Sequence, residues 1–152
     1  MNQSARETII EWSSGHIRAR AIHTAATLAV ADLIAEGISS AQELARKLSV
    51  HPEALTRLMR LLASYGIFKE EKSGHFALTD LAQPLLSNDP ASLRAWLAYH
   101  DGDSYRWNAY GAMASSIKTG KPAFDELYGA SYFDFIHQEP LMAKQFDEGM
   151  EN

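Results

Sequence analysis

The residues of this chain that could take part in chemistry gather in its C-terminal third, where aromatic and methionine side chains are frequent. They are Trp96, Tyr99, His100, Tyr105, Trp107, Tyr110, Met113, Phe124, Tyr128, Tyr132, Phe133, Phe135, Phe146 and Met150. Packing in a core and between domains explains most of them, because large apolar side chains are mainly buried in folded proteins. Others could line a pocket for a flat polycyclic or phenolic molecule, since such pockets are mostly apolar with a few orienting polar groups. Methionine suits a wall that adapts to the shape of a ligand.

Other kinds of chemistry find no support in the motifs. The stretch TGKP at 119–122 resembles a phosphate-binding loop, but Ser115 and Pro122 break the motif. No G-x-G-x-x-G follows an expected strand, no G-x-S-x-G occurs, and there is no cysteine. The histidines form no H-x-x-x-H pair; they are His16, His23, His51, His75, His100 and His137. We therefore expect this chain to contain no metal site, no cofactor site and no catalytic residue of its own.

Composition indicates a soluble globular protein with a core of its own, since 46% of the 152 residues are hydrophobic and 22% are charged. A net charge of -5 argues against a surface that binds nucleic acid nonspecifically. The absence of cysteine fits a reducing cytoplasm. The first residues lack the apolar core of a signal peptide, and the most apolar stretch, 25–35, is too short to span a bilayer. We expect a cytoplasmic protein that does not bind membranes.

Helices must position these side chains. Apolar residues recur at three- and four-residue steps from position 16 to Gly37, among them Ile17, Ala21, Ala25 and Leu28. This pattern predicts one amphipathic helix, preceded by a short helix that ends near Gly15. A helix so far ahead of a compact motif must bury its apolar stripe, and a partner subunit is one natural place. We expect residues 1–38 to form dimerisation helices.

Residues 39–80 predict a winged-helix motif. Ser40 and Glu43 have the spacing of a capping box, Pro52 suits a first helical turn, and a hairpin turns near Gly74. Gly66 is expected to end the helix that starts near Pro52, and Thr79 to cap the next helix. Residues 81–152 continue as short helices, one of which is expected to begin at Asp89. DNA reading by this motif is disfavoured, because residues 39–80 contain six Lys or Arg against five Asp or Glu. The predicted fold is mainly α, with one small β-hairpin.

Taken together, these segments resemble the N-terminal region of S-adenosylmethionine-dependent O-methyltransferases of the plant phenylpropanoid and bacterial polyketide type. The matching features are Trp107 at the start of a helix, TGKPAF at 119–124, Gly129, YFDF at 132–135 and FDEGM at 146–150, together with the helix and winged-helix segments before them. The resemblance implies an intertwined homodimer that does not bind DNA and contributes a wall to the pocket of an aromatic or polyketide acceptor. By position in the family motif, Phe146 and Met150 line that pocket, and Tyr99, His100 and Trp107 fall in the region that faces the acceptor.

In that family the donor site and the general-base histidine lie in a Rossmann-like domain that follows such a segment. The sequence stops at Asn152 before that domain, so we expect S-adenosylmethionine to bind only the full-length enzyme and this chain alone to be inactive. Relatives on the same scaffold leave decarboxylation and hydroxylation open as reactions. Two other functions also stay open: a winged-helix transcription regulator, and a stand-alone protein that binds an aromatic ligand.

Overall fold

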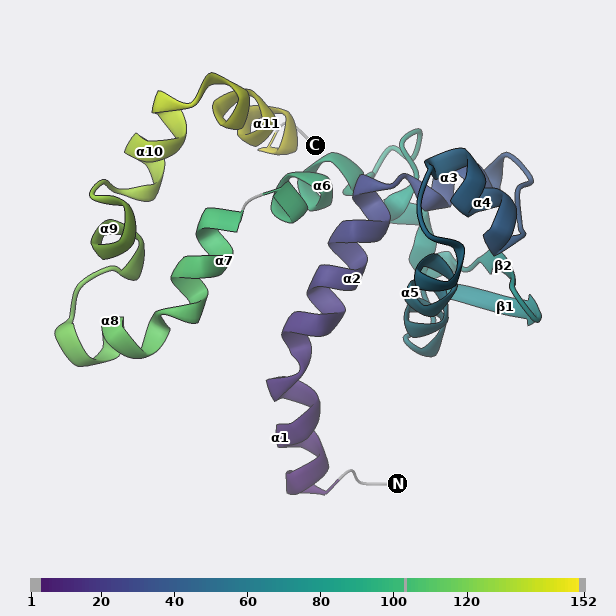
Figure 1. The fold of residues 1–152 in the computed structure, drawn as a ribbon, viewed down its shortest axis with the longest axis horizontal. Helices are drawn as coiled ribbons and strands as arrows, with labels where there is room; N and C mark the ends of the chain where they lie inside the picture. Colours follow the sequence, from purple (N-terminus) through teal and green to yellow (C-terminus); the bar gives the residue numbers. More distant parts are fainter. Residues whose placement is uncertain (1–3, 103, 151–152) are drawn as a thin grey trace.

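The computed structural model describes residues 4–102 and 104–150, without the side chains at 141, 145 and 148–150. This part of the chain is mostly helical, with one two-stranded antiparallel sheet, as the sequence predicts. Figure 1 shows three regions: a rod of helices at the N-terminus, a compact module that carries the hairpin, and an arm of short helices that curves back on itself. No helix in these ranges is long and apolar enough to cross a membrane.

The rod consists of α1 (Ala5–Ser13) and α2 (Gly15–Thr27), which lie end to end in Figure 1. Ser4 caps α1 in a capping box, because its hydroxyl accepts from the amide of Glu7 while its own amide donates to the Glu7 carboxylate. No residue of α1 is buried. The inner face of α2 packs on the rest of the protein, so α2 anchors the rod and α1 projects from it.

The compact module contains α3 (Val30–Ala35), α4 (Ala41–Leu48), α5 (Pro52–Ser64), β1 (Phe68–Lys72) and β2 (His75–Leu78). The strands pair in antiparallel register, with Phe68 opposite Leu78, and an irregularity between Glu70 and Lys72 precedes the turn at Gly74. Alternate side chains of the hairpin point inward, so Phe68 and Phe76 are buried with Met59 of α5. Residues 41–78 thus show the predicted order of helices followed by a hairpin.

The predicted capping box at Ser40 is wrong, although Ser40 does precede α4. Its side chain makes no capping hydrogen bond. Instead the backbone amide of Ala41 donates to the carbonyl of Gly74 at 2.8 Å, and Phe76 donates to the carbonyl of Ser39 at 2.8 Å. The hairpin therefore supplies an acceptor for one of the free amides at the start of α4, while the hydroxyl of Ser40 supplies none.

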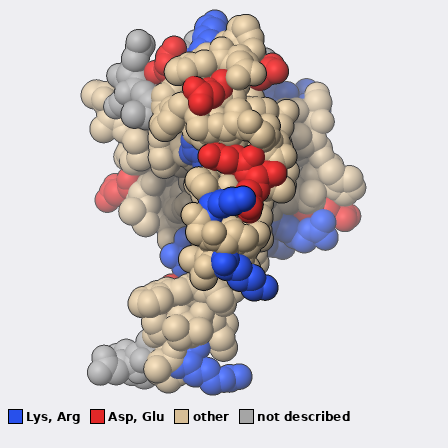
Figure 2. Space-filling model, turned by 90° about the vertical axis from the view of Figure 1, so that its left-hand side faces the viewer, with Lys and Arg blue, Asp and Glu red and all other residues tan. Residues whose placement is uncertain are grey.

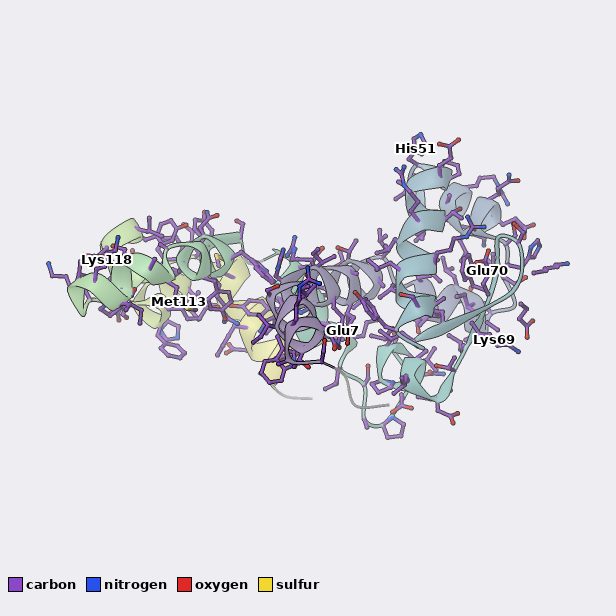
Figure 3. The ribbon with its side chains drawn as sticks, turned by 90° about the horizontal axis from the view of Figure 1, so that it is seen from below. Glu7, His51, Lys69, Glu70, Met113 and Lys118 are labelled. Atoms are coloured by element: carbon purple, nitrogen blue, oxygen red, sulfur yellow. The ribbon has the colours of Figure 1, made fainter. Side chains whose placement is uncertain are left out.

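The arm follows η1 (Asp80–Leu85), which Thr79 caps as predicted. It contains α6 (Arg94–Gly102), α7 (Ser104–Gly111), α8 (Met113–Thr119), α9 (Ala123–Tyr128), α10 (Tyr132–Gln138) and α11 (Pro140–Met150). In Figure 1 the arm leaves the module through α6, turns at α8 and returns, so that α11 lies beside α6. Figure 3 places Met113 and Lys118 of α8 at one end of the molecule and Lys69 and Glu70 of the hairpin at the other.

Several predicted helices prove to be shorter than the apolar pattern suggested. The helix expected from 16 to 36 breaks at Ala29, whose left-handed backbone (φ 52°) separates α2 from α3. The break redirects the chain so that Val30 and Ile34 enter the core of the module. The helix expected to begin at Asp89 begins only at Arg94, because the Asp89 carboxylate accepts from the amide of Ala91 and forms a turn first.

Candidate functional site

The arm brings together all the predicted pocket residues whose side chains are described. The ring of Tyr99 on α6 lies 5.4 Å from the ring of His100 and 5.8 Å from the ring of Phe146 on α11. Trp107 on α7 donates its indole N–H to the carbonyl of His100 at 3.2 Å. We call Tyr99, His100, Trp107 and Phe146 the aromatic face. The side chain of Met150 lies outside the described residues, and the role of all five residues in binding stays a prediction.

Two polar residues border this face: Arg106, which the sequence did not suggest as a candidate, and Tyr132, which was considered only as one of the many aromatic residues of the C-terminal third. The Nη1 of Arg106 lies 2.8 Å from the Nε2 of His100, its Nη2 donates to the hydroxyl of Tyr132, and the two hydroxyls of Tyr99 and Tyr132 also share a hydrogen bond. The guanidinium carbon of Arg106 lies 4.5 Å from the centre of the Tyr132 ring, within the range of a cation–π contact. A cationic, hydrogen-bonding edge therefore borders the apolar rings.

Both ring nitrogens of His100 lie within hydrogen-bond distance of a neighbour. Its Nδ1 lies 2.8 Å from the carbonyl oxygen of Trp96, which can only accept, so Nδ1 carries a proton. Its Nε2 lies against the guanidinium of Arg106, which can only donate, so Nε2 offers a lone pair. These contacts correspond to the tautomer with its proton on Nδ1.

Helix α2 fixes the last turn of α6. The Nη1 of Arg20 donates to the carbonyls of Asp101 at 3.0 Å and His100 at 3.4 Å, and its Nη2 lies 3.3 Å from the Asp101 carboxylate. The hydroxyl of Thr24 donates to the same carboxylate at 3.1 Å. A cation at this place also opposes the negative end of the helix dipole. Arg20 further lies 5.2 Å from the ring centre of Trp107, so one side chain contacts both α6 and α7.

His23, one turn further along α2, is buried beside the aromatic face, with 8% of its surface exposed. The centre of its ring lies 5.6 Å from that of His100 and 6.1 Å from that of Trp107. Burial lowers the pKa of His23 below its ordinary value, and the neighbouring side chains of His100 and Arg20 lower it further against an opposing effect of Asp101. His23 is therefore neutral at pH 7. Its spacing in the sequence gave no sign of this position, because the position results from the packing of α2 against α6.

The residues predicted for the dimer interface occupy different surroundings. Ala21 and Ala25 are buried in the core of their own protomer, with 6% and 2% of their surface exposed, and Leu28 packs against that core. Ile17 is 48% exposed. Their contact with a partner stays a prediction, and Ile17 is the member of this set that offers the most surface for it.

Helix α1 carries an exposed apolar surface. Ile9, Ile10 and Trp12 expose 63%, 51% and 73% of their surface. Figure 2 shows the N-terminal rod projecting from the body, with most of its visible surface neither acidic nor basic. An exposed apolar patch of this kind marks a place where another surface can pack.

An ion pair joins α5, the helix that could read DNA, to the hairpin. Arg60 of α5 forms a two-pronged ion pair with Glu70 of β1, with nitrogen–oxygen distances of 2.9 to 3.1 Å, and Glu70 also accepts from the amide of Gly74 at 2.8 Å. The bonds from Arg60 and Gly74 hold the pKa of Glu70 below its usual range. The guanidinium that would face a phosphate or a base is thus engaged within the module.

The fold and the aromatic face define a helical module with a hairpin, joined to an arm that presents rings and a few polar groups. Comparison with known families places the chain more narrowly: the model of the O-methyltransferase dimerisation domain matches residues 10–88, and the chain belongs to this family. The expected resemblance is thereby confirmed.

Similar proteins come from bacterial biosynthesis. The chain is 36% identical over 150 residues to the mitomycin biosynthesis 6-O-methyltransferase of Streptomyces lavendulae, covering 97% of this chain and 42% of that protein. It is 32% identical to the phenazine O-methyltransferase PhzM of Lysobacter antibioticus, covering 92% and 40%. The solved structure of LaPhzM matches with a TM-score of 0.87 at 29% identity, over 97% of this chain and 44% of that one. The chain spans about two fifths of the length of the relatives it matches.

Proposed function

We propose that this chain is the dimerisation and acceptor-side part of an S-adenosylmethionine-dependent methyltransferase that acts on an aromatic small molecule as a homodimer in the cytoplasm. The observation that carries the proposal is the family match combined with the cluster of Tyr99, His100, Trp107 and Phe146. Relatives named for a naphthoate, a hydroxybenzoate and a phenazine support a flat aromatic acceptor.

In this proposal the chain binds and orients the acceptor. Trp107 and Phe146 stack on the acceptor ring and exclude water from it, and the polar edge formed by Arg106 and Tyr132 sets its orientation. S-adenosylmethionine supplies an electrophilic methyl group in such enzymes. In this proposal its binding site belongs to the full-length enzyme, because the sheet of the described residues is a two-stranded hairpin, unlike the parallel sheets that hold such cofactors.

The type of reaction that we propose is based on the names of similar proteins. Among similar proteins, aclacinomycin 10-hydroxylase RdmB of Streptomyces purpurascens is 32% identical over 129 residues. Another, from Pseudomonas aeruginosa, is named as a phenazine-1-carboxylate N-methyltransferase. Methyl transfer to oxygen is the reaction we propose, because most of the relatives named above carry that activity in their names.

The indole N–H resonances of the tryptophans test the acceptor wall. On titration with phenazine-1-carboxylate we expect the Trp107 resonance to shift, while that of Trp12, on the projecting helix, stays in place as an internal control. Millimolar affinity fits one wall of a larger pocket, whereas micromolar affinity would favour a stand-alone binding protein. No shift at Trp107 would contradict the proposal.

Two further measurements address the partner. Sedimentation velocity across a dilution series should show a dimer that dissociates, and a monomer at every concentration would refute the homodimer. A gel shift at low salt should show no sequence-preferring binding of DNA, because Arg60 is paired with Glu70. Sequence-preferring binding with a steep salt dependence would favour the transcription regulator instead.

A further inference from the structure

His23 has two ring nitrogens in different surroundings. Among the described residues, the buried side-chain nitrogens without a hydrogen-bond partner are Arg18 Nε and His23 Nδ1. The Nε2 of His23 does not belong to this group and makes no bond to a described residue, so it keeps contact with solvent. A ring that is otherwise buried therefore presents one nitrogen outward.

A buried polar atom without a hydrogen-bond partner destabilises a folded protein, and native structures contain few such atoms. An apolar side chain of similar size in place of His23 would avoid this cost. The neighbours of the imidazole indicate a role that offsets this cost. They are His100 and Trp107, whose ring centres lie 5.6 and 6.1 Å from that of His23. Both neighbours belong to the aromatic face.

The proton of a neutral His23 ring favours Nε2. A buried N–H without an acceptor is rarer in proteins than an acceptor with an empty lone pair, and water or a ligand can accept only at the open nitrogen. The lowered pKa keeps the second proton off the ring at pH 7. His23 thus holds a single N–H donor beside two aromatic rings.

We propose that His23 is a further acceptor-binding residue, whose Nε2–H donates a hydrogen bond to an oxygen of the aromatic acceptor. The inference rests on the proposed function and makes it more specific: the acceptor carries a hydroxyl, carbonyl or carboxylate oxygen next to the ring that stacks on Trp107. It also assigns a direct role in binding to α2, the helix that carries the predicted dimer residue Ile17.

Variants at position 23 separate the two nitrogens. The amide of glutamine reaches about as far as Nε2, the amide of asparagine reaches only as far as Nδ1, and leucine offers neither. With phenazine-1-carboxylate as the probe and the Trp107 indole shift as the signal, His23→Gln should bind within about twofold of the unsubstituted chain. His23→Asn and His23→Leu should bind roughly three- to tenfold more weakly, the loss of one hydrogen bond. His51→Asn, at the exposed start of α5, changes a histidine outside the aromatic face and should leave the affinity unchanged.

Stability measurements keep this test independent of folding. His23→Leu removes the sealed nitrogen and should unfold at the same or a higher urea concentration, so its weaker binding cannot come from a damaged fold. If all His23 variants bind alike while the unsubstituted chain binds, the inference fails and the proposed function stands. If the unsubstituted chain shows no shift at Trp107, both fail together. If glutamine weakens binding as much as asparagine, the assignment of Nε2 as the donor is overturned.

Discussion

The contact between Arg20 and the end of α6 is open to a quantitative test by a double-mutant cycle. The variants are Arg20→Met, which keeps the length of the side chain, Asp101→Asn, which keeps an acceptor for Thr24, and their combination. The ion pair at 3.3 Å is partly screened, since the side chains of Arg20 and Asp101 are 43% and 18% exposed. We therefore expect a coupling energy of about 1 kcal/mol between them.

Arg20→Met should destabilise the protein by more than this coupling. It also removes the bonds to the carbonyls of His100 and Asp101 and the contact with the Trp107 ring, none of which depends on the Asp101 carboxylate. The total loss should be about 2 to 3 kcal/mol. For a protein of this size, each kcal/mol lowers the melting temperature by about 2 to 4 °C.

The assay is urea unfolding followed by circular dichroism at one fixed protein concentration, because association also contributes to stability. Exchange of the Trp107 indole proton provides a local readout, since its acceptor is the carbonyl of His100 that Arg20 also binds. Arg20→Met should speed this exchange and Asp101→Asn should change it less. If Arg20→Met costs no more than Asp101→Asn, or if the coupling is zero, Arg20 does not fix α6 and the reasoning is refuted.

Three other perturbations follow from the geometry. Because the pKa of His23 is lowered in the folded state, the unfolded chain binds more protons just below pH 6.5, so the free energy of unfolding should fall as the pH drops through that range. His23→Leu should lack this pH-dependent part of the stability, and an identical pH profile for the variant and the unsubstituted chain would contradict the prediction. Glu70→Gln should speed hydrogen exchange at the amide of Gly74, which loses a charged acceptor, and unchanged exchange would show that the carboxylate does not hold the turn. Trp12→Ser should raise the dimer dissociation constant roughly tenfold or more in sedimentation experiments, whereas Leu127→Ser on α9, also exposed, should not; equal dimers would exclude α1 from the interface.

Local signals were sufficient to predict the compact module. Pro52 at the start of α5 and Gly66 after its end act through their own backbone preferences, and Thr79 caps η1 through its hydroxyl. The structure has all three where the sequence predicts them. Ser40 shows the limit of this approach, because the expected local cap is absent and the start of α4 instead bonds to the hairpin, which is distant in sequence. The sequence could not anticipate that outcome, since it depends on how β2 packs against the start of α4.

The residues of the candidate site were predictable only where they lie close to one another in the sequence. Tyr99, His100 and Trp107 are close in sequence and were predicted together as pocket residues. His23 and Tyr132 reach the same face from helices that are distant in the sequence. Helix periodicity predicts which side of a helix is buried but not the angle at which two helices cross. A lone histidine on an Ala-rich helix therefore gave no sign that its ring would lie beside those of His100 and Trp107.

Helix α2 links the module, the arm and the predicted dimer surface. Ala21 and Ala25 are small enough to let it pack closely into the core, and Arg20 and His23 contact the arm from the same helix. Ile17 remains exposed toward the projecting end of the rod. A partner that packs against α1 and Ile17 would order the end of α2 next to Arg20, and by linkage an acceptor bound at the aromatic face would favour the same arrangement. If the proposed function holds, dimerisation and acceptor binding are therefore expected to strengthen each other through this one helix.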